Sequence, residues 1–123
     1  MYVRTHFAQE IEKLLRQEIE FIDVRELNRR IKEEKFIIID VRSFDKYTDF
    51  HLPNAVSLPY KQKASEYILL SKIEKDKKIV FYCESGTCGE ARAAANQFSG
   101  MGYYYVYILK EGVQEWKNLK NQY

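Results

Sequence analysis

The stretch that decides the fold is Ile79-Val80-Phe81-Tyr82-Cys83-Glu84-Ser85-Gly86-Thr87-Cys88-Gly89-Glu90, which leads into the alanine-rich segment 91–98. Its first four residues predict a buried β-strand, and the alanines predict a helix. A thiol placed between such a strand and the N-terminus of a helix meets backbone N–H groups and the positive end of the helix dipole, which favour the thiolate. The stretch therefore predicts a parallel α/β sheet with a reactive cysteine at the carboxyl edge.

Strands and helices alternate along the rest of the chain. Short apolar runs predict strands at 19–22, 36–41, 55–58, 78–82 and 103–109. Capping residues and apolar side chains at three- and four-residue spacing predict helices at 23–34, 43–50, about 64–73, 91–98 and 112–120. The alternation predicts an α/β domain with a central parallel five-stranded sheet and helices on both faces.

The N-terminal segment 1–18 is interpreted as a helical extension of the domain at 19–123. Phe7, Ile11, Leu14 and Leu15 recur at spacings of three and four, which predicts an amphipathic helix over 5–18. Its apolar stripe could cover the chain's own core or exchange with a second copy to form a homodimer. Periodicity does not choose between these two arrangements.

Composition narrows the classes of function. The chain has 123 residues, a formal net charge of +2 and 31% charged residues, which predicts no binding to nucleic acid or to an anionic membrane. No apolar run approaches the roughly 18 residues of a membrane span, and the first residues lack a signal-peptide core. We therefore expect a cytoplasmic protein with reduced thiols. With two cysteines and the isolated His6 and His51, we expect neither a metal site nor a cofactor.

Four sequence blocks in order resemble the rhodanese-like family of single-domain sulfurtransferases. The blocks are Ile38-Ile39-Asp40-Val41-Arg42-Ser43, Phe50-His51-Leu52-Pro53-Asn54-Ala55-Val56-Ser57-Leu58-Pro59, the Cys83 loop with Ala94-Ala95, and Val106-Tyr107-Ile108-Leu109-Lys110-Glu111-Gly112 leading to Trp116. The likeness covers about residues 19–119. Phe50, Asn54 and Glu111 stand where the family usually has glycines, and we expect only local backbone adjustments from these changes.

The cysteine loop is similar to a two-cysteine, Cys-x4-Cys variant of that family. It is about two residues longer than the common sulfurtransferase loop, and this length resembles the phosphatase and arsenate-reductase branch. That branch carries an arginine six places after its cysteine, where this chain has Gly89. Glu84 and Glu90 also bring charge of the wrong sign for an oxyanion substrate. Phosphatase and arsenate-reductase activities are therefore disfavoured.

The resemblance implies a sulfurtransferase or persulfide carrier that works by double displacement. The Cys83 thiolate would take the outer sulfur of a small-molecule or protein persulfide donor and pass it to an acceptor thiol. The loop residues expected to bind the persulfide are Glu84, Ser85, Gly86, Thr87, Gly89 and Glu90, with both glycines letting the N–H groups converge. Because the loop has two glutamates and no Lys or Arg, we expect poor activity with thiosulfate.

The sequence leaves open the role of the second cysteine, and it suggests a supporting role for three polar residues outside the loop. Cys88 is either a resolving or relay thiol or a passive replacement for a basic residue. Asp40, Arg42 and His51 are expected to frame the site rather than to take part in catalysis. Two rival functions stay open: a thiol redox switch based on a Cys83/Cys88 disulfide, and a catalytically silent rhodanese-like binding module.

Overall fold

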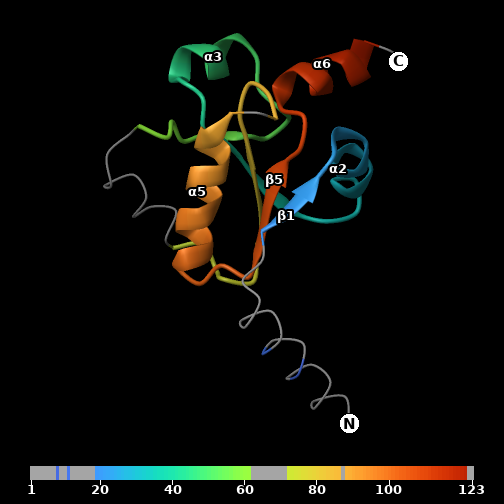
Figure 1. Ribbon diagram of the computed structural model, residues 1–123. Helices are drawn as coiled ribbons and strands as arrows, with labels where there is room; N and C mark the ends of the chain where they lie inside the picture. Colours follow the sequence, from blue (N-terminus) through green and yellow to red (C-terminus); the bar gives the residue numbers. More distant parts are fainter. Residues whose placement is uncertain (1–7, 9–10, 12–18, 62–71, 87, 122–123) are drawn as a thin grey trace.

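The computed structural model describes residues 8, 11, 19–61, 72–86 and 88–121 of the chain. Strands and helices alternate through these residues (Figure 1). The elements are β1 Glu20–Ile22, α2 Val24–Arg30, β2 Phe36–Asp40, α3 Phe44–Asp49, β3 Val56–Ser57, β4 Lys78–Tyr82, α5 Gly89–Gly100, β5 Tyr105–Leu109 and α6 Val113–Asn121. None of the helices in the described part of the chain has the length and apolar character needed to cross a membrane.

The described strands form one sheet in which every neighbouring pair is parallel. The strand order is β1-β5-β4-β2-β3, so β4 lies at the centre between β5 and β2. This arrangement confirms the predicted fold class with its five-stranded parallel sheet. Because all strands run the same way, their carboxyl ends meet at one edge, and the cysteine loop follows β4 at that edge.

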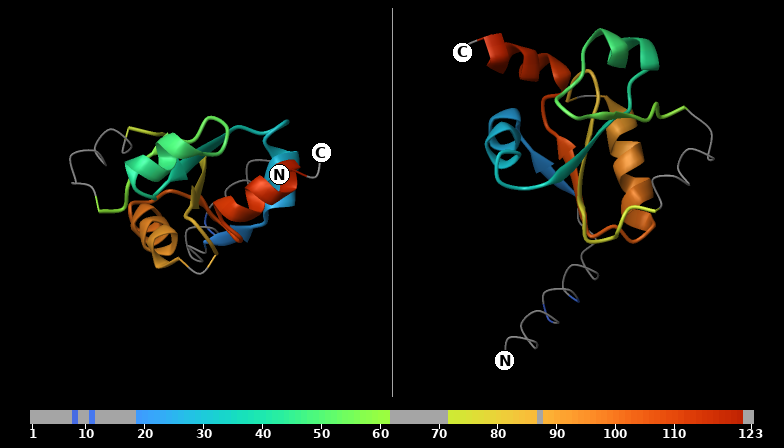
Figure 2. Two further views of the ribbon diagram at one scale, coloured as in Figure 1. Left: turned by 90° about the horizontal axis from the view of Figure 1, so that it is seen from above. Right: turned by 180° about the vertical axis from the view of Figure 1, so that it is seen from behind.

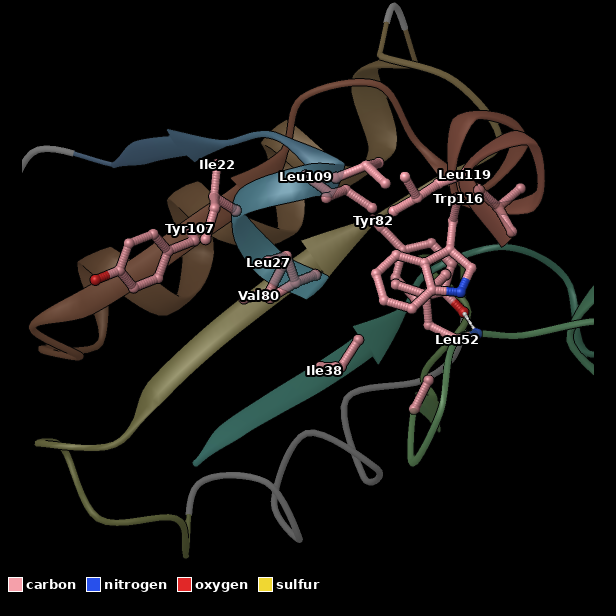
Figure 3. Close-up of a cluster of buried hydrophobic side chains, with 13 residues drawn as sticks. Ile22, Leu27, Ile38, Leu52, Val80, Tyr82, Tyr107, Leu109, Trp116 and Leu119 are labelled. Atoms are coloured by element: carbon pink, nitrogen blue, oxygen red, sulfur yellow. Dashed lines mark hydrogen bonds between the residues drawn. The ribbon is translucent and has the colours of Figure 1, made fainter. Parts of the chain in front are cut away.

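Helices cover both faces of the sheet. The two views of Figure 2 show α5 on one face and α2 with α6 on the other. Side chains of β4 alternate between the two faces: Val80 and Tyr82 join the cluster under α2 and α6, whereas Ile79 and Phe81 join the one under α5. Figure 3 shows the first cluster, in which Val80 and Tyr82 lie with Trp116 of α6. Burial on both faces accounts for the unbroken apolar run of β4.

Several element boundaries differ from the prediction by one to four residues. Helix α2 ends at Arg30 rather than near Glu34, and β5 begins at Tyr105 rather than at 103. Helix α5 begins at Gly89, two residues earlier than predicted, because Cys88 serves as its N-cap residue. Tyr103 is buried beside Phe98, with 5.2 Å between ring centroids, where it packs on the end of α5 instead of extending the strand.

Two predicted helices cannot be compared with the structure. The amphipathic helix over 5–18 lies outside the described residues except for Ala8 and Ile11. The helix expected near 64–73 lies mostly outside them as well. The N-terminal extension and the homodimer proposed for it therefore stay predictions.

Candidate active site

Cys83 and Cys88 are joined by a disulfide across the loop that follows β4. Their Cα atoms are 6.2 Å apart, within the range that a disulfide spans. Cys83 is 4% exposed and belongs to the apolar cluster under α5, whereas Cys88 is only partly buried. Since Cys88 is the N-cap residue of α5, the pair lies where the positive end of the helix dipole acts most strongly. That position favours negative charge on either sulfur once the bond is reduced.

A cavity of about 410 Å³ opens beside the two sulfurs. Its charged lining includes the loop residues Glu84 and Glu90. It also includes three cations from outside the loop, namely Arg42, Lys46 and Lys61. The charge of the cavity therefore differs from the charge of the loop alone, which carries only the two glutamates.

Arg42 ties the cysteine loop to the end of β2. Its guanidinium bonds the fully buried Asp40, with Nη2 to Oδ2 at 2.9 Å and Nε to Oδ1 at 3.1 Å. Its Nη1 donates to Oε2 of Glu84 at 2.9 Å. Burial works against the charge of Arg42, but these hydrogen bonds raise the pKa of Arg42 above its ordinary value. The residue directly after Cys83 is thus held by a permanently charged side chain.

Tyr82, the last residue of β4, completes the buried network. Its hydroxyl donates to Oδ2 of Asp40 at 2.6 Å and accepts from the backbone N–H of Leu52 at 3.1 Å. Burial first, and the bond to Asp40 second, raise the pKa of Tyr82, so the phenol keeps its proton. Asp40 and Arg42 therefore pair with each other beneath the loop, as expected for residues that frame the site.

The two glutamates of the loop occupy different environments. Glu84 forms the ion pair with Arg42, whereas no cation among the described residues pairs with Glu90. An oxygen of the Glu90 carboxylate and the sulfurs of Cys83 and Cys88 all lie within 4.8 Å of one another. Sequence reasoning treated both residues as one source of negative charge, but only Glu90 lies beside both sulfurs.

The turn between β5 and α6 supports the cysteine loop from the other side. The backbone N–H of Val113 donates to the carbonyl oxygen of Cys83 at 3.1 Å. A Cβ atom on Gly86 would collide with the carbonyl oxygen of Lys110. At Gly112, where φ is +81°, a Cβ atom would lie 2.6 Å from Cα of Ser85. These two glycines permit the close approach of two backbone segments.

The expected role of Gly89 is not supported in the same way. A Cβ atom at Gly89 would meet nothing within 4 Å, so the loop does not need a glycine there for space. Glu111, which departs from the family's glycine pattern, accepts a hydrogen bond from the backbone N–H of Val24 at 3.0 Å. It thereby caps the first residue of α2, a role that its sequence position did not suggest.

The remaining predicted residues are His51, which lies outside the cavity lining, Ser85, which lies in the loop, and Thr87. Nδ1 of His51 is hydrogen-bonded to the backbone carbonyl oxygen of Tyr47 at 2.8 Å. The imidazole ring of His51 also stacks on the side-chain ring of Tyr47, with 3.9 Å between the centroids. It does not line the cavity that holds Cys83. The carbonyl oxygen of Ser85 accepts a bond from the N–H of Cys88 at 3.3 Å. Thr87 lies outside the described residues.

Sequence reasoning missed the lysines of the cavity. Lys46 comes from α3 and Lys61 from the segment after β3, so neither belongs to a loop next to the cysteines. The one available signal was topological: both follow strands whose carboxyl ends meet at the edge that holds Cys83. The topology predicts that these segments lie near Cys83, but it does not predict which of their side chains line the cavity.

Comparisons with known proteins agree with this fold. The family model for the rhodanese-like domain matches residues 23–119. The chain is 30% identical to the uncharacterized protein YibN of Escherichia coli over 105 residues, covering 85% of this chain and 71% of YibN. The rhodanese-like domain of the Alr3790 protein from Anabaena is 28% identical, with a TM-score of 0.70, over 83% of this chain and 75% of that one.

A further relative is a larger protein. The chain is 32% identical over 96 residues to the tRNA uridine(34) hydroxylase of Buchnera aphidicola, covering 76% of this chain. It spans only 30% of the length of that hydroxylase. The match of the family model across most of the chain, together with the sheet order and the cysteine at the end of β4, shows that this chain belongs to the rhodanese-like domain family.

Proposed function

We propose that the chain transfers sulfane sulfur through a persulfide on Cys83. The observation that carries this proposal is the placement of Cys83: it directly follows the central strand, is joined to the N-cap residue of α5 and lines the cavity. A thiolate there is favoured by the helix dipole, and the residue lines the cavity although it is only 4% exposed. Membership in the rhodanese-like family supports a role in sulfur transfer or a related reaction.

The first half of the reaction is a displacement at sulfur. The Cys83 thiolate attacks the outer sulfur of a low-molecular-weight or protein persulfide, a new S–S bond forms, and the donor leaves as a thiolate. An acceptor thiolate then attacks the outer sulfur of the Cys83 persulfide and releases the original Cys83 thiolate. No electrons are lost in this cycle, so it needs no added reductant.

The charge of the cavity bears on the choice of donor. Poor activity with thiosulfate stays a prediction, and it rests on the two glutamates of the loop alone. Lys46 and Lys61 line the same cavity, and Arg42 neutralises Glu84. Steady-state kinetics on Lys46→Ala and Lys61→Ala variants would measure whether these lysines lower the KM for an anionic donor.

Intact mass spectrometry tests the proposal directly. Reduced protein is incubated with inorganic polysulfide, and the Cys88→Ser variant is used so that no second thiol can remove the persulfide. We expect a gain of about 32 Da, one sulfur atom, that cyanide removes. The same gain should be absent when Cys83 is also replaced by alanine. An adduct that forms without Cys83, or no adduct at all, would contradict the proposal.

A thiol redox switch is the second candidate, because the structure contains the Cys83–Cys88 disulfide. In that function a mild oxidant joins the two thiols, and no sulfur atom is transferred. The activity of the tRNA-modifying relative is not carried over, since the chain spans only 30% of that protein. A catalytically silent binding module needs no lowered pKa at Cys83, whereas sulfur transfer and the redox switch both do. Measuring the rate at which an alkylating reagent labels Cys83 across pH therefore separates the silent module from the two other functions.

A further inference from the structure

We propose that Cys88 resolves the Cys83 persulfide and releases hydrosulfide, which makes the chain a persulfide reductase that consumes a dithiol. This inference rests on the proposed function, because it needs a persulfide on Cys83. It goes beyond that function because the sulfur leaves as hydrosulfide instead of passing to an acceptor thiol. The substrate is a low-molecular-weight persulfide or polysulfide, and the second substrate is a dithiol reductant.

The loop places Cys88 where this step requires it. The disulfide joins Sγ of Cys83 to Sγ of Cys88, so the backbone already holds the two residues at the separation of the product. The Cα–Cα distance of 6.2 Å is a common one for disulfides. Cys88 reaches the inner sulfur of the persulfide, the one attached to Cys83, without unfolding the loop. An external acceptor must instead diffuse into the cavity before it can compete.

The atoms and electrons of the step balance. Cys88 attacks the inner sulfur of Cys83–S–S⁻, the Cys83–Cys88 bond forms, and the outer sulfur leaves. The proton of the Cys88 thiol ends on that outer sulfur, so the products are the disulfide and HS⁻. Over the whole cycle the two cysteines lose two electrons and the sulfane sulfur gains them. A dithiol reductant then returns both cysteines to thiols by exchange.

Glu90 provides a route for the proton. A persulfide anion would have to expel a sulfide dianion, so the departing sulfur needs a proton as the S–S bond breaks. The Cys88 thiol must lose its proton at the same moment, as it attacks the inner sulfur. A Glu90 oxygen lies within 4.8 Å of both sulfurs, and no described cation holds it. One carboxylate can therefore accept the proton from Cys88 and deliver it to the outgoing sulfur.

Glu84 does not share this property, although it belongs to the same loop. Its carboxylate is bound by Nη1 of Arg42 at 2.9 Å. The ion pair holds the Glu84 carboxylate toward the end of β2. The proposal therefore assigns the proton transfer to Glu90 alone.

A single-turnover experiment tests the resolving step. Reduced full-length protein is freed of reductant without air and mixed with inorganic polysulfide, and its mass is followed over time. For the unchanged chain we expect a loss of about 2 Da, the disulfide, and one hydrosulfide per disulfide above the amount in the Cys88→Ser sample. For Cys88→Ser we expect the persulfide to accumulate as a gain of about 32 Da.

The outcomes separate this inference from the function on which it rests. If Cys88→Ser gains sulfur and the unchanged chain also keeps its persulfide beside a titratable Cys88 thiol, the resolving step is wrong and sulfur transfer stands. If Cys88→Ser gains no sulfur, the proposed function fails and the resolving step fails with it. A sample without polysulfide must keep both thiols, since a disulfide formed there would come from another oxidant.

The pH profile of hydrosulfide release tests Glu90. We expect Glu90→Gln to slow the release at least about tenfold near pH 7, because no base takes the proton from Cys88. The difference should shrink at alkaline pH, where the Cys88 thiol ionises without help. Glu90→Asp should restore part of the rate, and Glu115→Gln, on the exposed side of α6, serves as the control. A uniform slowing at every pH would overturn the role of Glu90.

Discussion

Ion pairs lie at both ends of the sheet, and the two sets differ in burial. At the carboxyl end, Arg42, whose side chain is 5% exposed, joins Asp40, which is 0% exposed, and Glu84, which is 45% exposed. At the amino end, Arg30 and Lys78 join Glu34, whose side chain is 29% exposed. The guanidinium carbon of Arg30 also lies 5.1 Å from the ring centroid of Phe36. The first set supports the cysteine loop, whereas the second lies among residues far from the cavity.

The difference teaches that burial, more than the number of contacts, decides what an ion pair does. Charges removed from water cost several kcal/mol each, so a buried pair is tolerated only with every hydrogen bond made. The buried pair of Arg42 with Asp40 fixes one position of the guanidinium, and this fixed guanidinium in turn holds Glu84 of the cysteine loop. A pair in contact with water contributes little and tolerates many geometries.

Replacing Arg42 by methionine should produce the largest change. The substitution leaves Asp40 buried without its counter-ion and releases Glu84, so we expect a loss of about 3–5 kcal/mol in the free energy of unfolding. Urea denaturation measures this loss. We also expect slower formation of the Cys83 persulfide, because the residue after Cys83 is no longer held. A loss comparable to that of Glu34→Gln at pH 7 would break the comparison between the two ends.

Replacing Gly86 by alanine tests the loop support at the carboxyl end. The added methyl group would collide with the carbonyl oxygen of Lys110, and we expect overpacking to cost about 1–3 kcal/mol. The matched control is Gly89→Ala, three residues later, where the new Cβ meets nothing within 4 Å. Thermal denaturation of the two variants compares them directly. Equal losses would mean that the turn after β5 does not support the loop.

Replacing Glu34 by glutamine should have the smallest effect and a distinct pH dependence. Hydrogen bonds from Arg30 first, and from Lys78 second, lower the pKa of Glu34 from 4.5 to about 2. The ion pairs therefore stabilise the fold above pH 4.5, and this contribution disappears as the pH falls toward 2. The variant should unfold with a flatter dependence on pH in that interval. If the free energy of unfolding fell equally between pH 4.5 and pH 2 in the variant and in the unchanged chain, the ion pairs of Glu34 would not be the source of this pH dependence.

Much of the fold follows from local sequence patterns. The apolar run at 79–82 predicts a strand buried on both faces, and the structure places it at the centre of the sheet. Helix α5 begins two residues before the predicted start, because its N-cap residue is a cysteine, which is unusual there and makes no side-chain cap hydrogen bond. Boundaries of this kind depend on tertiary contacts that propensities do not contain.

The site was predictable in its chemistry and not in its charges. Cys83 and the loop follow from the order of strand, cysteines and helix, but the same sequence gives no means of distinguishing Glu84 from Glu90. Their difference arises because Arg42, 42 positions before Glu84, reaches one carboxylate and not the other. Contacts across such separations depend on the register of β2 against β4, which only the folded chain defines.

The support of the cysteine loop has a consequence for how this site can change during evolution. At Gly86 and Gly112 the loop rests on backbone atoms of the neighbouring segment. The scaffold therefore restricts these two glycines more than it restricts the side chain at position 88. A substitution at 88 can exchange a thiol for a hydroxyl or a cation while the loop keeps its path. The same backbone can thus acquire a different second reactant beside Cys83 through a single codon.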